Sequence, residues 1–191
     1  MATETKWPTE LIALAEWALR QEDLRQQFIH AKKANNLQSV PGIAKCIEPI
    51  LVLAIYEAGL GKGFIDEETI GYGKPYPKKG RKKGNSKRAD LAFKDSGKGK
   101  KWGYIEVKKY SKGGHSIKVD IKKLRRIKIK AQRWVLVYRV REETEKTKPL
   151  KDLLEKNFSS DLKIKESRTF GTITKKESKG ICEICLAKLG S

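Results

Sequence analysis

The chain has 191 residues, 38% hydrophobic and 35% charged, so it can build a folded core and is not expected to be disordered. Its 43 Lys and Arg residues against 23 Asp and Glu give a formal net charge of +20, and the commonest reason for such an excess is a polyanionic partner, nucleic acid before membrane. The alternative is a basic protein with no specific partner, but the clustering of the charge favours nucleic acid.

The N-terminal residues and the cysteines favour a soluble cytoplasmic protein. Residues 1–6 lead into Trp7-Pro8 without the apolar run of a signal peptide. The most apolar stretch, 47–58, contains two glutamates and a proline and is too short to cross a bilayer. Three cysteines argue against a disulfide framework and fit a reducing compartment. We therefore expect no membrane association.

The first part of the chain is predicted to be mainly helical. Apolar residues at helical spacing predict a helix from Thr9, which serves as its N-cap, and a second helical stretch covers about 21–34. Residues 43–58 are almost entirely apolar, which predicts a buried core helix. A short strand is expected at 69–72.

Residues 74–88 differ from the rest in composition. Eight of these fifteen residues are basic, and prolines and glycines separate them, so we expect a flexible loop. A loop of this kind can close over a DNA backbone and neutralise its phosphates, although it is otherwise an ordinary surface loop. The residues predicted to bind DNA here are Lys78, Lys79, Arg81, Lys82, Lys83 and Arg88.

The second part of the chain alternates strands and helices. In chain order, the predicted elements are strands at 88–94 and 102–110, a helix at 117–131, a strand at 133–141, a helix at 148–158 and one or two strands within 162–174. This order predicts an α/β domain with a mixed central sheet flanked by helices and with extra N-terminal helices.

The first two of these strands are expected to form a hairpin, because the turn formers of 96–99 separate them. Pairing about this tip places Leu91 opposite Ile105 and Asp90 opposite Glu106. Side chains alternate between the faces of a strand, so one face becomes apolar and the other polar. The apolar face holds Leu91, Phe93, Ile105 and Val107, and the polar face holds Asp90, Glu106 and Lys108.

The polar face predicts a divalent-cation site. Two opposed carboxylates repel each other by several tenths of a kcal/mol or more, and a cation such as Mg²⁺ removes that cost. Lys108 lies on the same side, where its charge can stabilise a developing phosphorane. The sequence Glu-Val-Lys is common on solvent-facing strands, so the prediction depends on the opposed Asp90 and the basic surroundings.

At this point the residues match a known pattern. The segment Arg88-Ala89-Asp90-Leu91-Ala92-Phe93, a turn, and then Tyr104-Ile105-Glu106-Val107-Lys108-Lys109 resembles the PD-(D/E)XK, or restriction-endonuclease-like, nuclease superfamily. The resemblance covers about 43–141, with alanine where the motif name has proline. It implies a restriction-endonuclease-like core in which Asp90 and Glu106 bind Mg²⁺, or Mn²⁺ in its place, and Lys108 is catalytic.

The resemblance also implies a glutamate in the helix before the hairpin. Glu48 is the first candidate and Glu57 the second, while the alternative for Glu48 is an acid favoured by the helix N-terminus. The helix after the hairpin carries Asp120 and several basic residues opposite its apolar face. These basic residues are candidates for holding DNA phosphates, or they form a solvated helix face: Lys122, Lys123, Arg125 and Arg126.

The resulting prediction is a Mg²⁺-dependent endonuclease acting on double-stranded DNA, with a restriction endonuclease and a homodimer favoured. A helical segment (1–40) precedes a nuclease core (41–145), and the helix and strands of 146–191 complete the same domain. The alternatives are a repair or junction-resolving nuclease and a non-catalytic nucleic-acid-binding protein.

Cys182 and Cys185 have the spacing of a metal-ligand pair, but they form a single pair. A structural zinc site needs four ligands, so buried or free thiols are expected.

Overall fold

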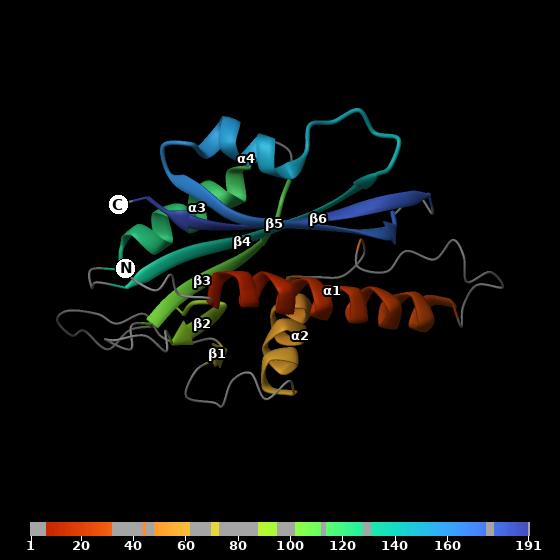
Figure 1. The fold of residues 1–191 in the computed structure, drawn as a ribbon, viewed down its shortest axis with the longest axis horizontal. Helices are drawn as coiled ribbons and strands as arrows, with labels where there is room; N and C mark the ends of the chain where they lie inside the picture. The colour runs from red at the N-terminus through yellow and green to blue at the C-terminus, as the bar shows by residue number, and fades with distance from the viewer. Residues whose placement is uncertain are drawn as a thin grey trace.

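The computed structural model describes residues 7–31, 44, 48–61, 70–72, 88–94, 102–111, 114–127, 131–174 and 178–190. These residues form four helices and six strands (Figure 1). The helices are α1 (Trp7–Ala31), α2 (Glu48–Gly61), α3 (His115–Arg125) and α4 (Leu150–Phe158). The strands are β1 (Ile70–Tyr72), β2 (Leu91–Lys94), β3 (Trp102–Lys109), β4 (Gln132–Glu142), β5 (Leu162–Ile173) and β6 (Lys179–Leu189).

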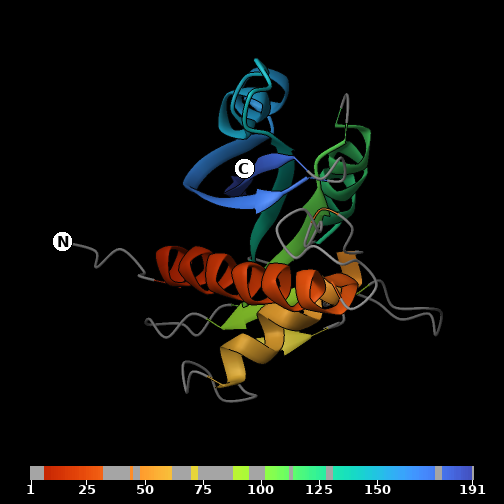
Figure 2. The ribbon, with the colours of Figure 1, turned by 90° about the vertical axis from the view of Figure 1, so that its right-hand side faces the viewer.

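The elements form three layers with the sheet in the middle. α1 and α2 lie on one side of the sheet, and α3 and α4 lie on the other (Figure 1). Figure 2 shows the same separation after a quarter turn. Each side of the sheet has its own apolar core, one built with α1 and α2 and the other with α3 and α4. The predicted α/β class with a mixed sheet is confirmed.

The sheet has the strand order β1-β2-β3-β4-β6-β5. Of the strands that the structure describes, only the central pair, β3 and β4, is parallel, and α3 makes the crossover between them. A parallel pair needs such a crossover, because a tight turn cannot return the chain to the starting end of the neighbouring strand. The crossover places α3 over the strand that carries Glu106 and Lys108.

The hairpin has the predicted register from Leu91 onward, whereas Asp90 precedes β2 and is not part of its ladder with β3. β2 and β3 pair with Leu91 opposite Ile105 and Phe93 opposite Gly103. The side chains predicted to be apolar and inward, Leu91, Phe93, Ile105 and Val107, are all buried in the core shared with α1 and α2. Hydrophobic alternation therefore fixed this register, because a slip of one residue would have turned these side chains to the opposite face.

Three helix boundaries differ from the prediction. α1 is one continuous helix, and its Thr9 donates a hydrogen bond to Glu166 at 3.0 Å instead of capping the helix. No proline or glycine interrupts 9–31, so nothing breaks the helix near residue 20. α2 begins at Glu48, and α3 ends at Arg125. Among the described residues, no helix is both long enough and apolar enough to span a membrane.

β6 was not predicted, yet it lies inside the sheet between β4 and β5. Its cysteines, Cys182 and Cys185, are buried and free. They are three residues apart on a strand, so they face opposite sides, and each belongs to a different core. The two thiols cannot chelate one ion together. Burial raises the pKa of Cys185 to about 12 and that of Cys182 still further.

Candidate active site

The candidate site lies along the part of β3 that extends beyond its pairing with β2. β2 starts at Leu91, so beyond that point no strand formed by the described residues lies beside β3 on this side. Two carboxylates take the place of a strand. Asp90 Oδ2 accepts a hydrogen bond from the backbone N–H of Val107 at 2.8 Å, and Glu48 Oε2 accepts one from that of Lys109 at 3.3 Å.

This arrangement sets the position of both acids from the backbone. Val107 and Lys109 are alternate residues of β3, so their N–H groups point to the same edge and lie about 7 Å apart. Glu48 is also the first residue of α2, where the positive end of the helix dipole favours a carboxylate. Glu48 therefore contacts the predicted site, whereas Glu57 is exposed further along α2.

Lys108 lies between acids from two helices. Its Nζ is 2.7 Å from Glu48 Oε1 and 3.5 Å from Asp120 Oδ2. Burial by itself would lower the pKa of Lys108, but the hydrogen bond to Glu48 and the charges of Asp120, Glu48 and Asp90 raise it above the ordinary value. The ammonium group is therefore held both in place and in its charged form.

Glu106 projects beneath α3 and is only 1% exposed. Its Oε2 accepts a hydrogen bond from Lys123 Nζ at 2.6 Å, an ion pair that compensates its buried charge. Asp120 and Lys123 are three residues apart on α3, so they share the helix face that covers β3. Asp120 is 6% exposed, so its predicted place on the solvated side of the helix is wrong.

Burial shapes the protonation of the two aspartates. It raises the pKa of Asp90, although the hydrogen bond from Val107 and the charge of Lys123 oppose the effect. It also raises the pKa of Asp120, against the charges of Lys108 and Lys123. The positive charge of Lys123 acts to lower the pKa of both aspartates, so its ammonium group lies near both carboxylates.

The donor chemistry of the cluster fits a hard divalent cation. When ionised, Glu48, Asp90, Glu106 and Asp120 surround two ammonium groups, which leaves a formal charge of −2. Asp120 Oδ2 is buried and has no well-formed hydrogen bond. No three His, Cys, Asp or Glu side chains of the described ranges are grouped closely enough to chelate an ion. Mg²⁺ needs only one or two carboxylates besides water and phosphate oxygens, and Asp90 and Glu106 would provide them.

The other residues predicted to bind DNA are distributed as follows. Arg88, Lys122 and Arg126 are exposed, and Arg125 forms an ion pair with Asp161 on the surface. Lys78, Lys79, Arg81, Lys82 and Lys83 lie outside the described residues. Sequence reasoning gave no role in the site to Asp120 and gave Lys123 only a DNA contact. The signal available for both was their spacing of three on the helix that crosses the hairpin.

Asp120→Asn is expected to stabilise the protein at pH 7 in the absence of divalent cations. The folded-state pKa of Asp120 lies above its ordinary value of 3.8, so the folded chain binds more protons than the unfolded chain between the two values. Stability therefore rises as the pH falls through the folded-state pKa, and the ionised acid costs stability above it.

Urea unfolding of both proteins between pH 4 and pH 7 measures this difference, which should shrink toward pH 4. Glu155→Gln, a charge removal on the exposed face of α4, should show no such trend. A less stable Asp120→Asn protein at pH 7 would contradict the expectation.

Comparisons with protein-family models, with curated proteins and with solved structures found no match to this chain. The site is therefore interpreted from its own geometry. Its defining feature is a half-buried cluster of carboxylates and lysines at the edge of β3, with a basic helix above it.

Proposed function

We propose that the protein is a Mg²⁺-dependent DNA endonuclease with a restriction-endonuclease-like core. One observation supports the proposal: Asp90, selected from the sequence with Glu106 and Lys108 as a catalytic set, accepts a hydrogen bond from the N–H of Val107, the β3 residue between the other two. Glu48, the predicted fourth member, hydrogen-bonds Lys108. A purely structural role for the hairpin acids would not require four acids around two lysines in a protein with an excess of basic residues.

Each side chain has a distinct task in phosphodiester hydrolysis. A bound Mg²⁺ would polarise a phosphodiester oxygen and make a water more acidic. Asp90 and Glu106 would hold the cation, and the backbone N–H of Val107 orients Asp90 for this. Lys108 presents a positive charge to the phosphate as negative charge develops there. Glu48 positions Lys108 through the ion pair with its ammonium group. The products would be 5′-phosphate and 3′-hydroxyl ends.

The wider proposal is a cytoplasmic restriction endonuclease that acts on double-stranded DNA. Cutting both strands requires two active sites or two visits by one, so we propose a homodimer. The formal charge of +20 supports a polyanionic substrate. A junction-resolving or repair nuclease would use the same chemistry on branched or damaged DNA.

The decisive experiment incubates the protein with supercoiled plasmid and Mg²⁺. We expect a cleavage activity that co-elutes with the protein and disappears when EDTA removes the cation. Discrete fragments would indicate a restriction enzyme, and cleavage of branched DNA alone would indicate a resolving enzyme. DNA binding without cleavage, in Mg²⁺ and in Mn²⁺, would overturn the proposal.

A further inference from the structure

A cavity of about 410 Å³ lies beside the carboxylate cluster. The described residues that line it come from α3 and from the segment just before β2: Arg88, Val119, Lys122, Lys123 and Arg126. Every polar side chain in this lining is basic. A concave surface lined by positive charges, with no acid among its described lining residues, favours an anion of phosphate type.

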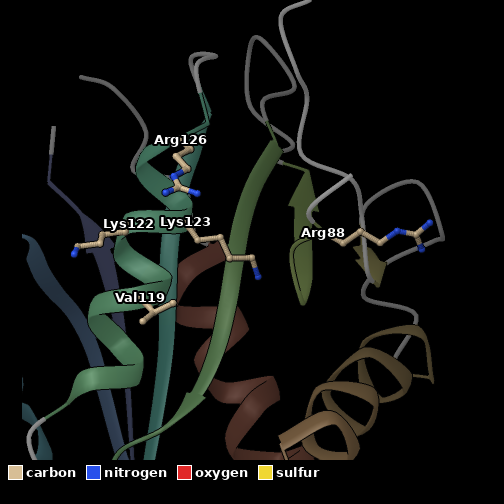
Figure 3. Close-up of a pocket in the computed structure, with 5 residues that line it drawn as sticks. All are labelled: Arg88, Val119, Lys122, Lys123 and Arg126. Carbon is tan, nitrogen blue, oxygen red and sulfur yellow. The ribbon is translucent and has the colours of Figure 1, made fainter. Parts of the chain in front are cut away.

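Lys123 belongs to both the cavity and the carboxylate cluster. Figure 3 shows its side chain extending from α3 across β3, with Arg126 further along the same helix. Its Nζ lies 2.6 Å from Glu106 Oε2. The guanidinium of Arg88 points away from α3 in this view, so the helix residues carry the argument.

The ammonium of Lys123 uses the oxygen that a divalent cation would need. Glu106 is almost fully buried, and a buried carboxylate that loses its counter-charge is strongly destabilised. Lys123 can therefore leave Glu106 when another cation replaces it there. Once released, the long and flexible side chain of Lys123 still borders the basic cavity, where its ammonium group can form an ion pair with a phosphate.

We propose that the cavity is a phosphodiester subsite and that Lys123 couples it to the cation site. Lys123 pairs with Glu106 when the cation is absent and with a phosphate in the cavity when the cation is bound. Cation and DNA then strengthen each other's binding through one side chain, and the coupling is reciprocal. This inference rests on the proposed endonuclease function, since it assigns the order in which that site is loaded.

The cation arm of the test is calorimetric titration of Mn²⁺ into the full chain without DNA. Lys123→Met removes the competing ammonium, so its Mn²⁺ affinity should rise at least about fivefold. Lys123→Gln loses the charge but keeps a hydrogen-bond donor for Glu106, which guards against a folding defect. Lys163→Met, an exposed lysine on β5, removes the same charge elsewhere and should leave the affinity unchanged.

The DNA arm measures the affinity for a fluorescent duplex by anisotropy, with and without Mn²⁺, in a Lys108→Met background to limit cleavage. Mn²⁺ should tighten binding at least about fivefold, and the gain should vanish when Lys123 is also replaced. Arg126→Met should lower the slope of log affinity against log salt by about one, as expected for the loss of one phosphate contact. Lys163→Met should leave this slope unchanged.

The proposal is supported if replacement of Lys123 has two opposite effects. The variant should bind Mn²⁺ more tightly, and Mn²⁺ should no longer increase its affinity for DNA. Unchanged Mn²⁺ affinity in both Lys123 variants overturns it, as does a Mn²⁺ gain that persists without Lys123 or an unaltered salt slope in Arg126→Met. These readouts are of binding alone, so they are independent of plasmid cleavage, whose absence would overturn the proposed function.

Discussion

Replacing Lys108 with methionine is expected to slow Mg²⁺-dependent DNA cleavage by about 100- to 1,000-fold, the usual cost of removing one preorganised group that stabilises transition-state charge. Lys108 is half-buried and fixed by Glu48 at 2.7 Å and Asp120 at 3.5 Å. Its charge is therefore in place before the substrate arrives. Methionine keeps the length and apolar volume of the side chain but has no charge to offer a phosphate.

Single-turnover cleavage of a plasmid or defined duplex measures this effect and separates chemistry from product release. Mn²⁺ binding should survive the substitution, since Lys108 is not a ligand of the proposed site. Lys163→Met is the matched control and should cleave at the wild-type rate. A Lys108→Met protein that cleaves within a few-fold of wild type would remove Lys108 from the proposed chemistry.

Asp90→Asn is expected to abolish the stabilisation that a divalent cation gives the folded protein and to reduce cleavage by at least about a hundredfold. Asparagine retains a side-chain oxygen for the N–H of Val107, so the turn into β2 is preserved. It lacks the charge that a hard cation requires. In the wild type, Mg²⁺ at about 100 times its dissociation constant should add about 2.7 kcal/mol to the free energy of unfolding.

Urea unfolding with and without MgCl₂ measures this gain, with Glu155→Gln as the charge-matched control. The gain should also fall with pH in the wild type. Burial raises the pKa of Asp90, so protons compete with the cation as the pH drops through that raised value. Equal stabilisation of wild type and Asp90→Asn by Mg²⁺ would show that the cation binds elsewhere.

The hairpin could be predicted from sequence because its determinants are local. A turn joins two short strands, and the alternation that buries Leu91 and Ile105 also directs Glu106 to the other face. Because the register of the apolar residues was predicted correctly, the face occupied by the polar residues of β3 was predicted correctly as well. The apolar face of α3 was predicted for the same reason, and Ile117, Ile121 and Leu124 are buried.

The remaining parts of the site depend on packing between distant segments. The crossover from β3 to β4 determines which side of α3 faces β3. In this orientation of the helix, Asp120 faces inward and is buried. The hydrogen bond from Lys109 to Glu48 joins residues 61 positions apart. β6 was missed because glutamate and lysine interrupt its apolar run, and a half-buried partner, Arg139, compensates Glu183. Sequence periodicity contains none of these relationships.

The interior position of β6 has a consequence for how the protein is made. β4 pairs with β6 across about forty to fifty-five residues, and α1 packs against the distant β5 and β6. Such long-range pairings form late, because the loops between them must close first. The sheet that supports β3 is therefore completed only after β6 has been synthesised. A nascent chain that contains Asp90, Glu106 and Lys108 but not yet β6 would carry the hairpin without its rigid support.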